Sequence, residues 1–498
     1  MPSIDNLAER LSTYLGSDQV NLVRRAYFYA EQAHDGQRRR SGEAYVTHPL
    51  AVASILADMH MDHQSLMAAM LHDVIEDTGI AKEALTAQFG ETIAELVDGV
   101  SKLTQMNFET KAEAQADGSY KLYGTKIFIS AGEHDLSENI IHIVLARLPD
   151  APAGTRGISL FIVPKFNVNA DGSLGERNPV KAGSIEHKMG IHANATCVLN
   201  FDGASAYLIG PANKGLECMF TFMNTARIGT AVQGIAHAEQ SFQGALPYAK
   251  ERRSMRALSG KKEPNQPADA LIHHGDVRRM LLTQKAVAEG GRAMIYFAAQ
   301  LADNMAVGIT NGDKETYDFW DDKLGFYTPI LKGVLTELGL EAANLGMQVF
   351  GGHGYIQEHG MEQVARDARI ATLYEGTTGI QALDLLGRKV LLSSKGKAVR
   401  EFTADIAKFC RDHVGNKEMR PYVWELTKIA TQWNYLTVRI MLQARKDRDL
   451  VGTAANDFLM YSGYAMLAYF WAKMAAVAFE KLEKGGNEEP AFYRAKVQ

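Results

Sequence analysis

The fold is decided at residues 119–130, which read Ser-Tyr-Lys-Leu-Tyr-Gly-Thr-Lys-Ile-Phe-Ile-Ser. Apolar and polar side chains alternate here, which is typical of a β-strand because successive side chains point to opposite faces of a sheet. Before this stretch, apolar residues recur at helical spacing in 20–34, 49–59 and 64–74, and strand alternation does not occur. The chain therefore changes from helices to strands near residue 119.

Downstream of this stretch the pattern first continues as strands and then returns to helices. Runs rich in β-branched residues predict further strands at 140–148, 157–163 and 195–201. Asp-Gly pairs predict turns at 117–118, 171–172 and 202–203. Helical spacing predicts long helices at 221–250, 275–305 and 322–349, and a last helical block at 398–482. The order of elements predicts a multidomain α+β protein.

Composition narrows the class of protein. The chain has 498 residues, of which 46% are hydrophobic and 22% charged, so we expect folded domains rather than intrinsic disorder. A net charge of −5 argues against nucleic acid as a partner. Three scattered cysteines (Cys197, Cys218 and Cys410) do not suit a disulfide framework, and they predict a reducing, cytoplasmic location.

Residues 458–479 are the most membrane-like stretch of the chain. They are rich in Met, Ala, Tyr and Phe, but Ser462, Gly463 and Lys473 interrupt them. A spanning helix usually needs about 20 apolar residues with few charges. We therefore predict a buried bundle helix and no membrane span.

The first candidate site combines His48, the adjacent pair His72-Asp73, and the acidic residues Glu76 and Asp77. Imidazole and carboxylate ligands on facing helices suit Mn²⁺, Zn²⁺ or Fe²⁺, which can activate a water for phosphoester cleavage. The spacing alone rather favours surface histidines beside an acidic helix end, because single His-Asp pairs are common.

Residues 36–49, 71–78 and 97–103 resemble the hydrolase domain of the RelA/SpoT-type (p)ppGpp synthetase/hydrolases. The resemblance implies an HD-type helical domain over 1–116. It also implies a set of site residues: His48, His72 and Asp73 as Mn²⁺ ligands, Glu76 and Asp77 at the water, and Arg39 at the nucleotide. The family's downstream Asp-Arg-Leu-His-Asn segment is missing from this sequence, so we expect a truncated hydrolase with an incomplete metal site.

The second candidate site is Tyr374-Glu375-Gly376-Thr377-Thr378, preceded by Phe-Gly-Gly-His-Gly-Tyr at 350–355 and Arg-Asp-Ala-Arg-Ile at 366–370. A glutamate beside glycine can be a capped, solvated carboxylate. A Gly-Gly-x-Gly turn lets backbone approach a phosphate closely, although this motif is common.

Residues 117–395 resemble the acyl-CoA dehydrogenase family. The segments that carry the resemblance are 124–132, 188–191, 213–215, 251–255, 348–355 and 374–377. The resemblance implies an antiparallel β middle domain over 117–220 and a C-terminal four-helix bundle over 221–395. Residues 396–498 resemble the additional helical tail of a longer subgroup of this family.

The resemblance implies an FAD-dependent α,β-desaturation of an acyl-CoA thioester. Glu375 matches the family's base, which removes the α-proton while a hydride passes to the flavin. A carboxylate base works best when it is desolvated, because burial raises its pKa toward the operating pH. The electron acceptor implied is electron-transferring flavoprotein or another acceptor.

The resemblance also implies the residues that bind FAD. Phe128 matches the residue packed on the flavin ring, and Ser130 matches one near flavin N5. The remaining matches are Arg252 at the pyrophosphate of the neighbouring subunit's FAD, Gln348 and Gly352 at further parts of that cofactor, and Thr377 on the ADP side. Because contacts come from a neighbour, a homodimer or tetramer is expected.

The two resemblances meet at Ala116-Asp117, inside a domain of each family. The helical first domain of the dehydrogenases and their Thr-Glu-Pro-x-Ala-Gly-Ser-Asp strand are replaced by the HD-like helices. Natural fusions usually join whole domains. Because the missing first domain forms one wall of the family's acyl pocket, we expect weak acyl-CoA binding. One alternative function is that of a truncated, metal-dependent (p)ppGpp hydrolase. The other alternative is an inactive chimeric product. Genomic DNA reading continuously across codons 110–125 would argue against that alternative.

Overall fold

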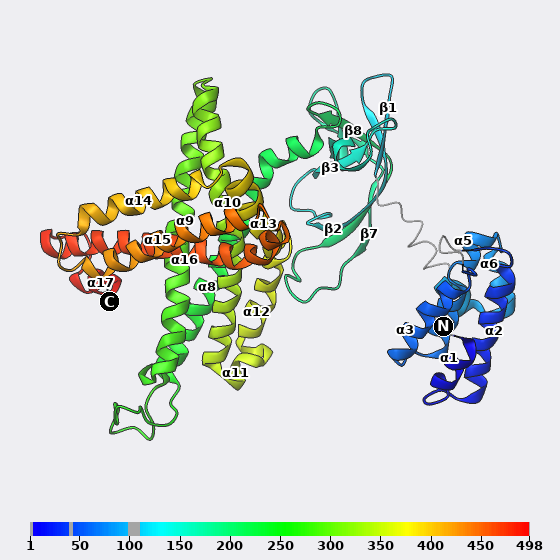
Figure 1. The fold of residues 1–498 in the computed structure, drawn as a ribbon, viewed down its shortest axis with the longest axis horizontal. Helices are drawn as coiled ribbons and strands as arrows, with labels where there is room; N and C mark the ends of the chain where they lie inside the picture. Colours follow the sequence, from blue (N-terminus) through cyan, green and yellow to red (C-terminus); the bar gives the residue numbers. More distant parts are fainter. Residues whose placement is uncertain (1–2, 39–42, 98–109, 498) are drawn as a thin grey trace. The chain divides into compact units, whose positions relative to one another are not determined.

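The computed structural model describes residues 3–38, 43–97 and 110–497 (Figure 1). The chain divides into two compact units, one formed by Met1–Ser184 with Cys197–Leu208 and the other by Ile185–Thr196 with Ile209–Gln498. The first unit contains a group of helices and a sheet, and the second is helical (Figure 1).

The N-terminal helices surround an apolar core of their own. They are α1 (Ile4–Leu11), α2 (Ser17–Ala33), α3 (Thr47–Asp58), α4 (His63–Leu71), α5 (Val74–Thr78) and α6 (Lys82–Phe89). Their core includes the fully buried Leu11, Leu66 and Leu85. Helical spacing predicted α2, α3 and α4 correctly, but the predicted helix 64–74 is interrupted, since α4 ends at Leu71 and α5 begins at Val74. His72 and Asp73 therefore lie at the junction of two helices.

The β part confirms the predicted change of period. The strands are β1 (Lys111–Ala114), β2 (Tyr120–Ser130), β3 (Ile141–Arg147), β4 (Ile158–Pro164), β5 (Phe166–Val168), β6 (Leu174–Arg177), β7 (Val180–Ile185) and β8 (Thr196–Ile209). Six of them form one sheet in the order β2-β1-β3-β4-β8-β7. Strand β1 runs antiparallel to β2, β3 runs antiparallel to β4, and one parallel register joins β1 to β3.

One predicted turn is wrong. Asp202-Gly203 lies inside β8, which continues without interruption to Ile209. Gly203 has φ +74°, and the N–H of Asp202 donates to the carbonyl of Pro179 at 3.1 Å. A glycine with positive φ within a strand is typical of a local bulge. The Asp-Gly pair therefore bends a strand instead of ending it.

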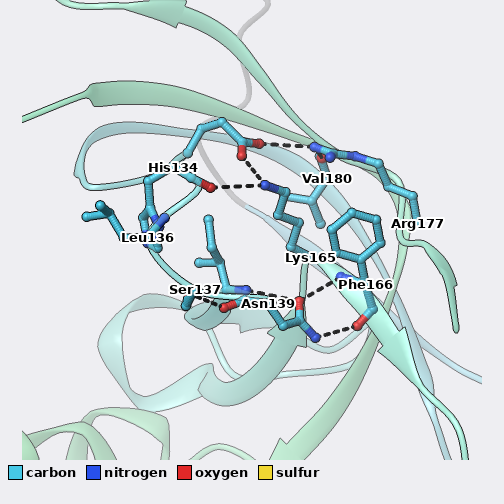
Figure 2. A network of polar contacts seen from close by, with 10 residues as sticks. His134, Leu136, Ser137, Asn139, Lys165, Phe166, Arg177 and Val180 are labelled. Atoms are coloured by element: carbon cyan, nitrogen blue, oxygen red, sulfur yellow. Dashed lines mark hydrogen bonds and ion pairs between the residues drawn. The ribbon is translucent and has the colours of Figure 1, made fainter. Parts of the chain in front are cut away.

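A polar network holds the loop that follows β2 (Figure 2). The Asn139 side chain accepts the N–H of Phe166 at 2.9 Å and donates to its carbonyl at 2.8 Å. Glu133 forms ion pairs with Lys165 and, at 3.0 Å, with Arg177. These contacts tie the loop after Ser130 to β5 and β6, and so restrain the end of β2.

Long helices form the second unit. They are α8 (Gly215–Glu251), α9 (Gly275–Thr310), α10 (Lys314–Phe350), α11 (Gly352–Tyr355), α12 (Met361–Arg369), α13 (Thr378–Leu383), α14 (Lys397–His413), α15 (Arg420–Gln443), α16 (Asp449–Lys484) and α17 (Pro490–Val497). One core joins residues from α8 to α16, including Leu335, Phe402 and Trp433. The predicted α+β fold class is thereby confirmed. The predicted domain boundaries at 116, 220 and 395 stay predictions, although β1 already begins at Lys111 and α8 at Gly215.

The membrane-like stretch lies in α16. Phe458, Leu459 and Met466 are buried in the helical core. Among the helices of the described residues, none is long and apolar enough to cross a membrane. The prediction of a buried bundle helix is confirmed.

Candidate functional site

Glu375 lies in a tight turn just before α13. Its φ is +56° and that of Gly376 is +90°. The left-handed region suits glycine, but it costs an L-residue such as glutamate about 1–2 kcal/mol. Glu375 Oε2 is buried and has no hydrogen-bond partner within residues 3–38, 43–97 and 110–497. The turn therefore holds a strained residue with a carboxylate oxygen, Oε2, to which the described residues donate no hydrogen bond.

Two fully buried side chains hold the carbonyl groups of this turn. Gln381 Nε2 donates to the carbonyl of Glu375 at 3.0 Å, and Lys332 Nζ donates to the carbonyl of Gly376 at 2.6 Å. Burial lowers the pKa of Lys332 to about 8, and the carboxylates of Glu337 and Glu375 oppose this shift. Neither residue was predicted. A signal was present for Lys332, which is a lone charge in the apolar run 327–335.

The residues after the turn begin α13. Thr377, predicted to contact the ADP side of FAD, is exposed, and its hydroxyl accepts the N–H of Ile380 at 3.4 Å as a helix cap. Thr378 Oγ1 donates to Glu337 Oε1 at 2.5 Å, and the hydroxyl of Tyr374 contacts Gln233. These contacts connect the turn to α8 and α10.

Three of the predicted cofactor residues meet in one cleft. Arg252, Gln348 and Gly352 line a cavity of about 490 Å³. Its other lining residues are Tyr248, Ser254, Leu271, Val277, Met280, Val349, Phe350, Gly351 and His353. At Gly351 and Gly352 an added Cβ would meet no atom within 4 Å, so the backbone there is open to a ligand. A guanidinium beside open glycine backbone suits a phosphate-bearing group.

Phe128 and Ser130 lie on β2, in the other unit. Phe128 is 69% exposed and has φ +60°, and Ser130 is exposed as well. Aromatic rings are usually buried in a folded protein, and exposed apolar surface often marks a binding site. Both residues are thus accessible to a ligand, as their predicted role requires.

The three predicted metal ligands are brought together at the junction of α4 and α5. One ligand atom from each of His48, His72 and Asp73 lies within 4.8 Å of the others. His72 Nε2 is 3.0 Å from Asp73 Oδ1, and His48 Nε2 is 3.7 Å from Asp73 Oδ2. His72 Nδ1 lies 2.8 Å from the carbonyl of Ala69, which orients the ring with Nε2 toward the cluster.

The other predicted hydrolase residues are only partly described. The hydroxyl of Tyr45 donates to Asp73 Oδ2 at 3.2 Å and also contacts Asp77. Burial and the hydrogen bond to Asp77 raise the pKa of Tyr45. Asp77 therefore lies next to the cluster, as predicted. Arg39 and the side chain of Glu76 lie outside the described part of the chain.

Family models match most of the chain. A model described as the C-terminal domain of acyl-CoA dehydrogenase matches residues 213–391, and one described as acetyl-CoA dehydrogenase C-terminal like matches 402–498. The HD domain model matches 26–142, which extends past the boundary of 116 expected from the sequence.

Individual relatives agree with these matches. The 3-methylmercaptopropionyl-CoA dehydrogenase of Ruegeria pomeroyi is 41% identical over 387 residues, which are 78% of this chain and 64% of that protein. The bifunctional (p)ppGpp synthase/hydrolase SpoT of Escherichia coli is 40% identical over 188 residues, 38% of this chain and 24% of that protein. This chain thus spans less than two thirds of either relative.

The fold resembles that of a solved structure. The structure of Caenorhabditis elegans ACDH-11 in complex with C11-CoA aligns with 99% of this chain and 89% of its own, at a TM-score of 0.61 and 18% identity. At this identity the likeness concerns the fold alone. Taken with the family models, it leads to one conclusion: the chain joins C-terminal domains of the acyl-CoA dehydrogenase family to an N-terminal HD domain related to the (p)ppGpp hydrolase SpoT.

Proposed function

We propose that this chain binds FAD and oxidises the Cα–Cβ bond of an acyl-CoA thioester, with Glu375 as the base that takes the α-proton. The observation that carries the proposal is the buried Oε2 of Glu375, which has no partner in the described residues. A carboxylate oxygen that the fold leaves unpaired is free to accept a proton from a substrate.

The residues present fit FAD. Arg252 offers a fixed positive charge for a pyrophosphate, and the open backbone of Gly351 and Gly352 leaves room beside it. When bound, the flavin supplies the acceptor for the hydride from Cβ. Phe128 would pack on its ring and Ser130 would lie near its N5. Following the family, the nucleotide cleft would receive the cofactor of a neighbouring subunit, so we propose at least a homodimer.

The protein's own contribution to the reaction is a held carboxylate and a polar turn. Glu375 accepts the α-proton, and its backbone N–H lies in the same turn, where it would donate to the thioester oxygen as negative charge develops. The replaced N-terminal domain removes one wall of the family's acyl pocket, so we propose that acyl-CoA binds weakly. The electron acceptor would be electron-transferring flavoprotein or a similar carrier.

The test is absorbance and turnover of the purified full chain. We expect flavin absorbance bands in the wild type and acyl-CoA oxidation with an artificial electron acceptor. Glu375→Gln should retain the flavin and lose turnover by about 10²–10⁴-fold, the usual contribution of a general base. Glu425→Gln, on an exposed glutamate of α15, is the matched control and should turn over like the wild type. Unchanged turnover in Glu375→Gln would refute the base.

The HD cluster supports a second candidate function, the binding of a divalent cation. Two imidazoles and one carboxylate within 4.8 Å suit Mn²⁺, Fe²⁺ or Zn²⁺. Three protein ligands leave open positions, and the sequence lacks the family's further aspartate segment. We therefore propose cation binding at His48, His72 and Asp73 rather than efficient (p)ppGpp hydrolysis.

A further inference from the structure

Beyond the proposed base, we propose that Lys332 and Gln381 are positioning residues, a clamp on two consecutive carbonyl groups that sets the direction of the Glu375 carboxylate. The inference rests on the proposed function for its catalytic consequence. The clamp itself concerns only the conformation of residues 375–376, so it can be tested without measuring enzyme activity.

The two hydrogen-bond donors of the clamp belong to different helices. Lys332 is in the middle of α10 and Gln381 is in α13, so the turn at 375–376 is held from two helices. The hydrogen bonds, 2.6 Å to the carbonyl of Gly376 and 3.0 Å to the carbonyl of Glu375, fix the orientation of successive peptide planes. Glu375 and Gly376 both have positive φ. If the turn relaxed, Glu375 would return to an ordinary backbone conformation, and its side chain would point in another direction.

The main interaction of the Lys332 ammonium is its hydrogen bond to the carbonyl of Gly376. Its side chain is fully buried, and among residues 3–38, 43–97 and 110–497 its ammonium donates to the carbonyl of Gly376 in the turn. The charged groups around it are Glu337 on α10, Glu375 on the turn and Arg227 on α8, whose partner is Asp384 at 3.3 Å. A buried ammonium is costly to desolvate, and a hydrogen bond from a charged donor is about twice as strong as a neutral one. A hydrophobic residue would fill α10 at lower cost, so the lysine is explained by the carbonyl it holds.

The protonation of Lys332 gives the clamp a pH dependence. Because burial lowers the pKa of Lys332 to about 8, the ammonium loses its proton just above neutral pH. The neutral amine still donates a hydrogen bond, but a weaker one. The clamp is therefore strong below about pH 8 and loosens above it.

The experiment is amide hydrogen exchange of residues 373–380, read by mass spectrometry on the full chain. Lys332→Met removes the charge and keeps the length, Lys332→Arg keeps a cation, and Gln381→Met removes the second donor. Lys314→Met is the matched control, because Lys314 lies on the same helix with its side chain 83% exposed. We expect about tenfold faster exchange at 373–380 in Lys332→Met and Gln381→Met, as the loss of a charged or buried hydrogen bond predicts.

The controls separate a clamp from a general effect. Lys314→Met should exchange like the wild type, and Lys332→Arg should exchange more slowly than Lys332→Met. Above pH 8 the exchange rates of Lys332→Met and wild type should become more similar, because the wild-type lysine is then neutral. The difference in exchange rate between Lys332→Arg and Lys332→Met should persist, because arginine stays charged. Unchanged exchange at 373–380 in both Met variants, or equal acceleration along all of α10, overturns the clamp. If Lys332→Met does not fold, the exchange rates of Lys332→Arg and Gln381→Met at 373–380 test the clamp. Unchanged exchange in Gln381→Met would then overturn it.

Turnover separates the clamp from the proposed function. In an active wild type, both Met variants should lower kcat about tenfold with KM nearly unchanged, because the base is displaced and not the substrate site. An inactive wild type with the expected exchange pattern refutes the proposed function and leaves the clamp standing. Normal exchange with normal kcat in both variants refutes the clamp alone.

Discussion

At the scale of single residues, the turn at 375–376 is the most unusual part of the backbone near the candidate site. Glu375 adopts a left-handed conformation that the chain elsewhere gives mostly to glycines. Such strain persists only where surrounding contacts overdetermine it, and it is common at functional sites. Here the contacts come from Lys332 and Gln381.

Gly376→Ala should destabilise this turn. Its φ of +90° is unfavourable for alanine, and the new Cβ would lie 2.7 Å from Gln381 Nε2. We expect a loss of about 1–2 kcal/mol in the free energy of unfolding, measured by urea denaturation. Gly379→Ala is the control, because its Cβ would meet only Thr377 Oγ1 at 3.9 Å and would raise helix propensity in α13. Equal stability of the two variants would contradict the strain argument.

At the scale of elements, the close contact of α8 and α10 supports the turn. A Cβ on Gly339 would lie 2.3 Å from the carbonyl oxygen of Gly234, and a Cβ on Gly234 would lie 2.4 Å from that of Leu335. The two helices therefore approach backbone to backbone, which only glycine permits. Lys332 lies about two helical turns before Gly339 on α10. The contact between the two helices therefore helps to fix the position of Lys332 relative to residues 375–376.

Gly339→Ala should push α8 and α10 apart. We expect it to lower the free energy of unfolding by about 1–3 kcal/mol, the usual cost of overpacking, as measured by urea denaturation followed by tryptophan fluorescence. Gly229→Ala on α8 is the matched control, since no atom lies within 4 Å of its Cβ. That control should be neutral or slightly stabilising, because alanine favours helix over glycine. A neutral Gly339→Ala would contradict the close approach.

At the scale of the whole molecule, two apolar cores are built from different stretches of the chain. The N-terminal core uses residues 4–97, whereas the large helical core uses residues 231–472. Each group of helices thus buries its own apolar surface. A ligand of one group should then stabilise that group.

Mn²⁺ should stabilise the N-terminal helices alone. At 100 times its Kd a ligand adds about 2.7 kcal/mol to the part that binds it. All four tryptophans, at 320, 424, 433 and 471, lie in the second unit, so their fluorescence reports that unit only. We expect Mn²⁺ to delay unfolding of the N-terminal helices in hydrogen exchange and to leave the fluorescence midpoint unchanged.

Histidine variants check that this effect comes from the cluster. His72→Ala should abolish the Mn²⁺ effect because it removes one of the three ligands. His63→Ala, at the first residue of α4 and outside the cluster, should retain it. An Mn²⁺ effect that survives in His72→Ala would place the cation elsewhere.

The sequence by itself determined the order of elements, the change of period near residue 119 and both family resemblances. It also placed His48, His72 and Asp73 in one site, and Arg252, Gln348 and Gly352 among the residues of another. The order of elements and the motifs are local features, since they depend on neighbouring residues. The grouping of residues distant in the chain, such as His48 with His72 or Arg252 with Gln348, came from the family resemblances.

Only the tertiary structure decided how the turn at Glu375 is held. Lys332 is 44 residues from Gly376, and nothing in the local pattern of α10 tells which carbonyl its ammonium meets. The conformation at Asp202-Gly203 is equally non-local, since an Asp-Gly pair favours a turn in a free chain but here lies inside β8, a strand with neighbours on both sides in the sheet. The physical reason is that side-chain contacts between distant segments depend on packing, which sequence periodicity does not encode.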